Sequence, residues 1–410
     1  MGSSLSTLYI DFDAFFANVD KQLDPSIRDR PVGITALNSD YSALITRCYM
    51  AKAAGVKRGM RARDARELCP EIVIRMARPD VYVRVHNEIL AEVERHLPVK
   101  KVWSVDEVEC ELIGREKARA QEIAMAMKAG LLENVGRYIT PSIGLAPNQF
   151  LAKVAAEMEK PNGFTVLRRE DLPGPLLNLS LTDLPGISEG VSARLSRAGI
   201  TTVEGLWNTS RKQARAIWGN IEGERFWAQL HGEQIVRPET KRRMFGHSRV
   251  LSGQFKEPKY ALDCLRLLTV KAGNRMRREN YSAGAMSVSF KTQDKRRWRG
   301  DASFAACRSD HALLAHMHSL FNQGLAEVRP KRLRHVYVML HDIARPDQRP
   351  PDLFEEASDQ KWDRLSDVMD GFNRKHGGAV LTLGPRAHIP GGYAGAKIAF
   401  GRVPDAEDFY

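Results

Sequence analysis

The segment Leu8-Tyr9-Ile10-Asp11-Phe12-Asp13-Ala14-Phe15-Phe16 decides the fold, because an apolar strand runs into two acids and then into a helical pattern. Further along, Ser104-Val105-Asp106-Glu107 separates two strand candidates at residues 99–103 and 108–112. Neighbouring residues on a regular strand face opposite sides, so Asp106 and Glu107 can join Asp11 at one site only if the chain turns between the strands. A hairpin supplies that turn.

Three carboxylates brought together in this way predict a metal site. Hard oxygen ligands without a nearby His or Cys favour Mg²⁺, and two such ions can activate a 3′ hydroxyl and stabilise a leaving pyrophosphate. The alternative is that the acids are separate surface charges or helix caps. The Asp-x-Asp pattern by itself does not decide between the two.

Strand and helix patterns alternate along the first part of the chain, which predicts an α+β or α/β core. Strands are expected at residues 31–34 and 138–145, and helices at 49–54, around 83–93 and around 123–131, with Asn148 capping a further helix. Residues 171–230 have a helical pattern, and residues 237–243 form a charged linker. Beyond it, strands are expected at 248–251, 285–290 and 335–340, and helices at 265–278, 313–326 and 365–372.

The composition is that of a multidomain globular protein. A chain of 410 residues exceeds what one hydrophobic core organises, and 43% apolar with 27% charged residues is near the globular average. No apolar stretch approaches the roughly 20 residues needed to span a bilayer, and the N-terminus lacks a signal core, so we expect a cytoplasmic protein. The five cysteines are scattered without C-x-x-C spacing, which argues against disulfides, structural zinc and iron–sulfur clusters.

The net charge of +12 favours a polyanionic partner. Residues 237–299 contain 17 Lys or Arg and 5 Asp or Glu, so this one stretch accounts for the whole excess. A nucleic-acid backbone is the expected counterpart, and a solvated basic surface is the alternative.

The two acidic motifs resemble the palm signatures of the Y-family translesion DNA polymerases of the DinB and UmuC type, and they occur in the family's order. The resemblance covers residues 7–235 and includes Tyr49, Ala51, Lys52, Gly55, Val56, Gly59, Ser142-Ile143-Gly144 and Lys160-Pro161-Asn162-Gly163. It implies an α+β multidomain right-hand polymerase with a ferredoxin-like palm at 1–22 and 80–170, small fingers at 23–79 and a helical helix-hairpin-helix thumb at 171–234. A linker at 235–243, an α/β little finger at 244–345 and a C-terminal tail at 346–410 complete the expected domains.

The resemblance also assigns roles to residues. Asp11, Asp106 and Glu107 are expected to be catalytic and to hold two Mg²⁺ ions together with the Phe12 carbonyl. The expected nucleotide contacts are Phe15, Phe16, Tyr49, Lys52 and Lys160, with Phe16 as the steric gate against ribonucleotides. Ammonium groups suit a triphosphate and its developing charge, and a solvated surface position is the alternative for each lysine. Arg47 and Lys52 look closer to the UmuC branch and Tyr49 to the DinB branch, so both branches stay open.

Two further regions are expected to contact DNA. Leu184-Pro185-Gly186-Ile187-Ser188 resembles a helix-hairpin-helix turn, in which amides near Gly186 and Ser188 would bind a phosphate, and a plain helical turn is the alternative. In the little finger the expected backbone contacts are Arg275, Arg277, Arg278, Lys295, Arg296, Arg297 and Arg299. Trp298 among them either stacks on a partner or packs in the core, and packing is favoured.

Gln348-Arg349-Pro350-Pro351-Asp352-Leu353-Phe354 lies in a proline-rich segment that should be extended and accessible. It resembles the clamp-binding peptides of bacterial polymerases, in which a Leu-Phe pair fills an apolar groove of the sliding clamp. Asp352, Leu353 and Phe354 match, whereas Gln348 lies two residues too far upstream. The alternative is an acidic loop whose Leu353 and Phe354 pack back on the protein.

The sequence therefore predicts a template-directed DNA polymerase that performs low-fidelity translesion synthesis from dNTPs on primer-template DNA, as a monomer assisted by a sliding clamp. One alternative is a catalytically inactive, polymerase-like DNA-binding accessory protein of the mutagenesis response, which would not need the three acids together with Phe16 and Lys160. A nucleotidyl cyclase with similar palm acids is a second alternative, but it leaves the thumb hairpin and the basic distal domain without a purpose.

Overall fold

The computed structural model describes residues 5–238, 241–345, 357–378, 380–384 and 403 of the chain. The chain divides into two compact units that change over between Pro238 and Glu239, within the segment expected to be a linker. Each unit is described by itself, and we keep the names palm, fingers, thumb and little finger for the segments expected above. No helix in the described ranges is long and apolar enough to cross a lipid bilayer.

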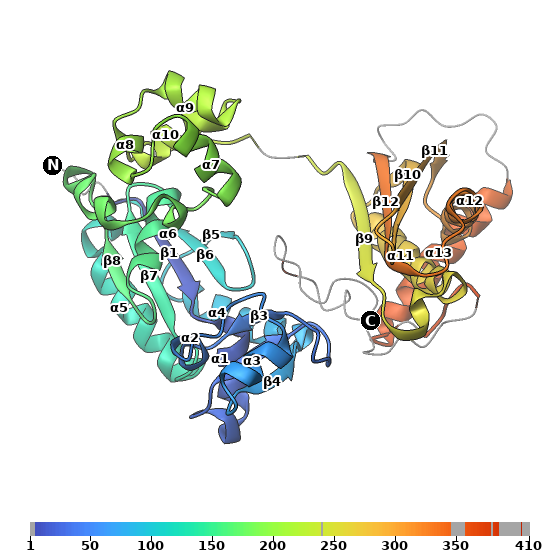
Figure 1. Ribbon diagram of the computed structural model, residues 1–410, viewed down its shortest axis with the longest axis horizontal. Helices are drawn as coiled ribbons and strands as arrows, with labels where there is room; N and C mark the ends of the chain where they lie inside the picture. The colour runs from blue at the N-terminus through green and yellow to red at the C-terminus, as the bar shows by residue number, and fades with distance from the viewer. Residues whose placement is uncertain (1–4, 239–240, 346–356, 379, 385–402, 404–410) are drawn as a thin grey trace. The chain divides into compact units, whose positions relative to one another are not determined.

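The palm is built on a sheet with the strand order β5-β6-β1-β7-β8 (Figure 1). Its strands are β1 Thr7–Phe12, β5 Val99–Val102, β6 Glu107–Glu111, β7 Pro141–Ala146 and β8 Phe164–Val166, and its helices are α4 Pro79–Glu94, α5 Glu116–Asn134 and α6 Gln149–Met158. Strand β1 pairs antiparallel with both β6 and β7 and therefore lies in the middle of the sheet. The predicted hairpin is present as β5 and β6.

The alternation of side chains along β1 decides which residues face the helix α6. Tyr9 belongs to the core that α6 shares with the thumb, whereas Leu8 and Ile10 are completely buried on the other face of the strand. Asp11 follows Tyr9 by two residues and so lies on the α6 side at the end of the strand. The mixed α+β architecture places an acid at the edge of a buried core.

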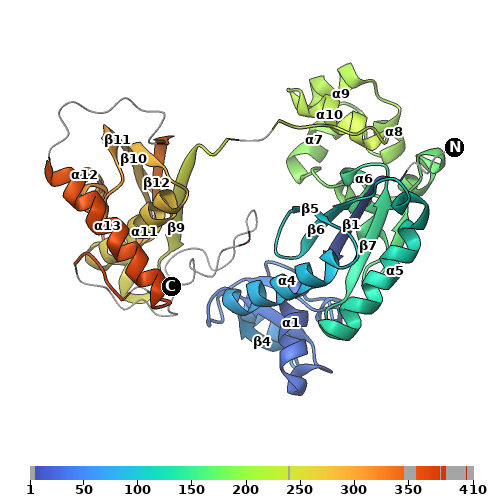
Figure 2. The same ribbon diagram turned by 180° about the vertical axis from the view of Figure 1, so that it is seen from behind.

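The fingers contain a small sheet with the order β3-β2-β4. Helix α1 Phe15–Leu23 leads from the palm into the fingers, whose elements are β2 Val32–Thr35, β3 Leu44–Arg47, α2 Tyr49–Ala53, α3 Ala62–Leu68 and β4 Val73–Met76. The predicted glycine cap of α2 is confirmed, because Gly55 has a φ of +83° and the Val56 amide donates to the Ala51 carbonyl at 3.0 Å. Figures 1 and 2 show the fingers and the thumb at opposite ends of the palm.

The thumb is helical, as expected. It comprises α7 Glu189–Arg197, α8 Val203–Trp207, α9 Arg211–Trp218 and α10 Glu222–Leu230, preceded by short 3₁₀ turns. Asn148 ties this region to the palm: its Oδ1 accepts from the Leu151 amide at 2.8 Å, while its Nδ2 donates to the carbonyls of Gln229 and Glu233 at 2.8 and 2.9 Å. One side chain therefore caps α6, as predicted, and anchors the end of α10.

The second unit is a sheet with the strand order β11-β10-β12-β9, covered by long helices. Its elements are β9 Met244–Val250, α11 Pro258–Arg278, β10 Ser282–Thr292, β11 Arg297–Cys307, α12 Asp310–Val328, β12 Leu333–Ala344 and α13 Ala357–Lys375. Strand β11 was not expected, because its arginines were interpreted as a DNA-binding cluster. Trp298 on β11 packs in the core, as favoured, since it stacks on Phe290 at 5.4 Å and its Nε1 donates to Glu327 at 2.6 Å.

The expectation that Arg277 contacts DNA is wrong. Its side chain is 2% exposed and pairs with Asp310 at 2.8 Å and with Asp370 at 2.6 Å. Asp370 belongs to α13, which lies in the segment expected to be a tail but packs on this unit, where Trp362 also stacks on His311 at 4.1 Å. A buried guanidinium needs carboxylate partners, and the ion pairs of Arg277 connect α11 with α12 and α13.

The five cysteines all fall within the described residues, and none of them is in a disulfide. Burial raises the pKa of Cys110 to about 12 and that of Cys264 to about 11, so both thiols stay protonated at neutral pH. The Cys48 sulfur accepts a hydrogen bond from the Val32 amide at 3.1 Å. Four of the five, all except the half-buried Cys307, are buried and pack as small apolar side chains.

Candidate active site

Strand pairing brings Asp11 and Glu107 together. In the antiparallel ladder of β1 and β6, Asp11 is the direct partner of Glu107, and Tyr9 is the partner of Glu109. Directly opposed residues project from the same face of a sheet, so both carboxylates lie on the side covered by α6. The turn before β6 is closed by the Trp103 amide, which donates to the Glu107 carbonyl at 2.9 Å.

Asp106 lies beside this pair but is oriented differently. Its backbone carbonyl accepts from the Phe12 amide at 2.9 Å, which holds the hairpin turn against the end of β1. Its carboxylate accepts a hydrogen bond from the Ser104 hydroxyl. Asp106 and the Phe12 carbonyl remain predicted metal ligands.

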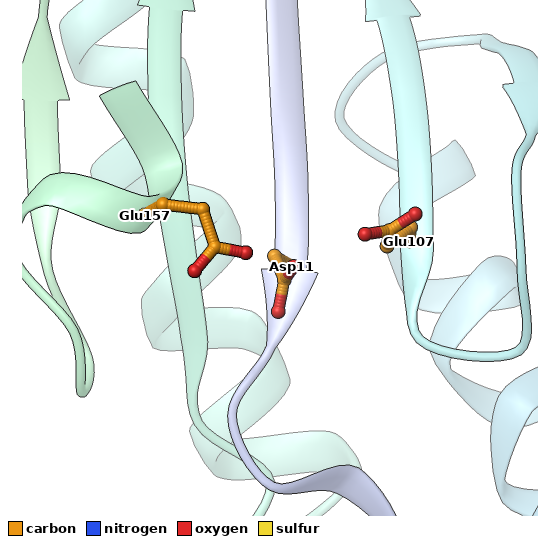
Figure 3. Close-up of side chains that lie close together, drawn as sticks. All are labelled: Asp11, Glu107 and Glu157. Atoms are coloured by element: carbon orange, nitrogen blue, oxygen red, sulfur yellow. The ribbon is translucent and has the colours of Figure 1, made fainter. Parts of the chain in front are cut away.

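Glu157 is an acid that the sequence reasoning missed. Figure 3 shows its carboxylate, at the end of α6, directed towards Asp11 on β1 and Glu107 on β6. Oxygen atoms of these three side chains all lie within 4.8 Å of one another. An acid near the end of a helix resembles an ordinary surface charge, and only its position three residues before Lys160 could have drawn attention to it.

Two lysines neutralise part of this charge. Lys160 Nζ lies 2.6 Å from Asp11 and 2.9 Å from Glu157. Lys153 on α6, which was not predicted, forms an ion pair with Glu107 and lies 5.5 Å from the centre of the Tyr9 ring. Lys160 is therefore a member of the site and not a solvated surface residue, since its side chain is only 16% exposed.

The ionisation of these groups reflects their burial. Burial raises the pKa of the Asp11 carboxyl well above its usual range, while Lys160 opposes this shift and Glu157 adds to it. Burial likewise raises the pKa of Asp106, against the hydrogen bond from Ser104. Burial lowers the pKa of Lys160, but Asp11 and Glu157 outweigh it, and the net pKa is raised. Burial thus makes the ionised carboxylates of this site unfavourable, and a cation bound beside them would stabilise their negative charge.

The donor set fits a hard divalent cation. The clustered side chains of Asp11, Glu107 and Glu157 supply carboxylate oxygens only, and such ligands suit Mg²⁺ better than the softer ions that His and Cys select. Asp11 and Glu107 come from neighbouring strands whose register is fixed by hydrogen bonds. The arrangement can hold a cation at a defined place without rearranging the backbone.

Phe16 lies in an aromatic cluster next to the acids. Ala14 adopts a left-handed conformation with a φ of +43°, which turns the chain from β1 into α1. The Phe16 ring is 7% exposed and stacks on Tyr82 of α4 at 4.5 Å, and Phe15 packs edge-on against the same tyrosine at 6.4 Å. Tyr82 was not identified from the sequence, although it backs the residue predicted to be the steric gate.

Tyr49 and Lys52 lie on α2 of the fingers. Burial raises the pKa of Tyr49, and the Asp13 carboxylate adds to the shift. Lys52 is exposed, and its Nζ lies 5.2 Å from the centre of the Tyr49 ring. The Tyr49 hydroxyl therefore lies close enough to the palm for the Asp13 carboxylate to raise its pKa, whereas the Lys52 side chain is exposed to solvent. Their contacts with a nucleotide remain predictions.

The thumb turn presents the residues expected to meet a phosphate. Gly186 and Ser188 are both exposed, while Leu184 and Ile187 on either side of Gly186 are buried. Gly186 has a φ of +92°, and the Ile187 amide donates to the Leu184 carbonyl at 3.1 Å. A left-handed glycine at an exposed turn before α7 agrees with a hairpin in which backbone amides are accessible.

The remaining predicted DNA contacts differ in exposure. Lys295, Arg296 and Arg297 are exposed at the turn from β10 to β11, where Arg296 pairs with Asp294 at 2.7 Å. Arg275 and Arg278 are half-buried on α11, and Arg275 contacts His247 at 3.4 Å. Arg299 pairs with Asp301 on the same strand at 2.9 Å. The predicted clamp-binding residues Asp352, Leu353 and Phe354, with Gln348, lie outside the described residues.

Comparison with family models gives two matches. Residues 10–157 match the impB/mucB/samB family, and residues 242–353 match the impB/mucB/samB family C-terminal domain. The first match contains Asp11, Asp106, Glu107 and Glu157, and the second ends before α13.

Curated relatives and solved structures agree with these matches. DNA polymerase IV 1 of Mesorhizobium japonicum is 27% identical over 94% of this chain and 89% of the relative, and DNA polymerase IV of Pseudomonas aeruginosa is 31% identical over 57% of this chain and 68% of the relative. A Y-family DNA polymerase chimera of Dbh and Dpo4 has the same fold, with a TM-score of 0.70 and 23% identity over 83% of this chain and 99% of the chimera. The insertion ternary complex of Dbh DNA polymerase has a TM-score of 0.56 and 24% identity over 83% of this chain and 99% of that chain.

The DNA polymerase IV relatives resolve the choice of branch that Arg47, Tyr49 and Lys52 left open. One matching segment falls in each of the two compact units of the fold. The chain therefore belongs to the impB/mucB/samB family and is a DinB-type member of the Y-family DNA polymerases.

Proposed function

We propose that this protein copies primer-template DNA with low fidelity, passing template lesions, by a two-metal-ion transfer of nucleotides from dNTPs. The observation that carries the proposal is the strand register that sets Asp11 opposite Glu107, with Lys160 bound to Asp11 at 2.6 Å. Acids in fixed positions beside a lysine suit a reaction in which metal ions and a triphosphate meet.

In this proposal the acids bind the metal ions, and the lysines and Tyr49 bind the nucleotide. Asp11, Asp106 and Glu107 would hold two Mg²⁺ ions, which when bound activate the primer 3′ hydroxyl and stabilise the leaving pyrophosphate. Lys160 supplies a cation for the triphosphate, and Tyr49 and Lys52 approach it from α2 of the fingers. The Phe16 ring, fixed by its stack on Tyr82, occupies the space that a ribose 2′ hydroxyl would need.

The small fingers support tolerance of lesions. Helices α2 and α3 comprise 5 and 7 residues, so they offer little surface to close over a nascent base pair. Selection by induced fit requires such a closure around the correct substrate. A polymerase that encloses the base pair loosely accepts distorted templates and makes more errors.

The exposed thumb turn at Gly186 and the exposed residues 295–297 are the proposed contacts with the DNA backbone. Dbh DNA polymerase, which has the same fold, has been solved as an insertion ternary complex, and this supports DNA and a nucleotide as partners. Residues 352–354 are the proposed sliding-clamp motif. We propose a monomer that acts on DNA in the cytoplasm.

Primer extension with Mg²⁺ and dNTPs tests the proposal, first on an undamaged template and then over a panel of defined template lesions. Asp106→Ala and Glu107→Ala should each abolish extension while largely sparing DNA binding, because these acids organise metal and not the duplex. Extension by both variants would refute the metal site. DNA binding without extension by the parent protein would instead support an inactive accessory protein.

A further inference from the structure

Helix α6 and the turn that follows it carry a line of charged residues along the acid cluster. Lys153 and Glu157 are four residues apart, which places them on one side of α6, and Lys160 follows in the turn after the helix. Lys153 pairs with Glu107, and Lys160 lies between Asp11 and Glu157. Figure 3 shows the Glu157 carboxylate directed towards Asp11 and Glu107.

The backbone next to Lys160 is held from several directions. The Asn162 amide donates to Asp13 Oδ2 at 2.6 Å, and Lys128 Nζ donates to the Asn162 carbonyl at 2.6 Å. A side chain at Gly163 would begin 2.0 Å from the Glu159 carbonyl oxygen, so the turn packs directly on the end of α6. The position of the Lys160 ammonium is therefore decided by the carboxylates that its flexible side chain reaches.

The two carboxylates that pair with Lys160, Asp11 and Glu157, differ in their exposure and in their predicted roles. The Asp11 side chain is 9% exposed and is a predicted metal ligand, so its charge is shared once a divalent cation is bound. Glu157 is 42% exposed and belongs to the same helix end as Lys160. When Asp11 engages a cation, Glu157 is the carboxylate that still holds Lys160 at the site.

We propose that Glu157 is a positioning residue that keeps the Lys160 ammonium beside the metal acids, ready for the triphosphate of the incoming nucleotide. The proposal rests on the function proposed above, because it needs a nucleotide for Lys160 to bind.

Steady-state primer extension by the full-length protein tests this role with four single variants and the double variant of Glu157→Gln with Lys160→Ala. Glu157→Gln should raise the KM for dNTP about fivefold and change kcat less than about twofold, since one partly exposed ion pair is lost. Glu157→Asp, which keeps the charge, should recover most of the parent KM. Glu159→Gln is the matched control, because it removes the same charge from an exposed neighbour two residues along and should leave KM unchanged.

The fourth variant, Lys160→Ala, identifies the route of the effect. If Glu157 acts through Lys160, Glu157→Gln should add little to the KM of Lys160→Ala, whereas independent effects would multiply. Effects on KM that multiply in the double variant would overturn the proposal, as would a Glu157→Gln variant indistinguishable from Glu159→Gln. A shift of the Mg²⁺ requirement with an unchanged KM for dNTP would also overturn it and make Glu157 a metal ligand. A parent protein that fails to extend a primer refutes the proposed function itself, which separates that failure from the failure of the positioning role.

Discussion

The buried cation Arg277 gives a prediction that separates structure from DNA binding. Replacing it by methionine keeps most of the side-chain volume and removes the charge. The substitution leaves Asp310, with a side chain 4% exposed, without its guanidinium partner at 2.8 Å, and it also removes the contact with Asp370 at 2.6 Å. The Arg308 carbonyl loses a donor at 2.7 Å as well.

The size of the effect follows from this burial. Removing one partner of a buried ion pair costs about 3–5 kcal/mol, because an uncompensated charge stays in a medium of low dielectric. Solvent screening gives little relief here, since the Arg277 and Asp310 side chains are 2% and 4% exposed. We expect Arg277→Met to lower the free energy of unfolding of the second unit by about 4 kcal/mol.

Arg299→Met is the matched control. It breaks an arginine–aspartate pair whose side chains are 61% and 51% exposed, so its cost should be about 0–1 kcal/mol. Hydrogen exchange of peptides from α11, α12 and α13, read with urea unfolding of the full chain, measures both variants. Equal protection of α13 in Arg277→Met and the parent would refute the reasoning. A weaker salt dependence of DNA binding in a fully stable Arg277→Met would restore the original assignment of this residue to DNA.

Four further predictions concern the nucleotide site, DNA, the clamp and pH. Phe16→Ala should admit ribonucleotides, and an unchanged ratio of dNTP to rNTP incorporation would make Phe16 ordinary core. Replacing the cations at 295–297 by glutamine should lower the slope of log affinity against log salt by about 1 for each lost phosphate contact, with little change in sequence preference, and an unaltered slope would contradict the DNA role. Changing Leu353 and Phe354 to alanine should abolish stimulation by the cognate sliding clamp and leave clamp-free extension intact; equal stimulation of parent and variant would rule the motif out. Burial, with Lys291 and Arg334, lowers the pKa of His335 from 6.5 to about 4, so the unfolded chain takes up the proton first and the second unit should lose stability as pH falls through this window. His335→Gln should flatten that dependence in pH-dependent unfolding curves, and an equally steep curve would show that other groups cause it.

The palm could be predicted from sequence because its strands alternate in a simple way around recognisable acids. The strand that ends near Asp11, the hairpin, the cap at Asn148 and, in the fingers, the glycine at Gly55 each depend on neighbours close in sequence, and each is confirmed. The orientation of the Asp106 carboxylate could not be predicted, because it depends on a turn and on a hydrogen bond from Ser104. Glu157 escaped notice because its partners come from β1 and β6, far from it in the chain.

The second unit was harder to predict for a different reason. In the sequence, a Lys or Arg that contacts DNA cannot be distinguished from one that forms a buried ion pair or one that lies on an edge strand. Arg277 is buried, residues 295–297 are exposed, and Arg299 alternates with Trp298 on β11, although all belong to one basic stretch. The composition therefore identified the basic stretch, but tertiary packing determines which of its arginines are exposed and which form buried ion pairs. The carboxylates of Asp310 and Asp370 that identify Arg277 as structural lie on other helices.

The pairing of β1 with β6 has a consequence for how such a site tolerates changes in chain length. The register is held along the strands, from the Thr7 and Glu111 pair to the Asp11 and Glu107 pair. Residues gained at 104–105 leave those pairs intact, because this part of the turn lies outside the ladder. A single residue removed between Val108 and Cys110, with the pairs at Cys110 and Glu111 kept, would instead move Glu107 and Val108 to opposite faces and put Asp106 in the place of Glu107. The turn must therefore keep Asp106, whose carbonyl accepts from the Phe12 amide, while the strand behind it can accept deletions only in pairs.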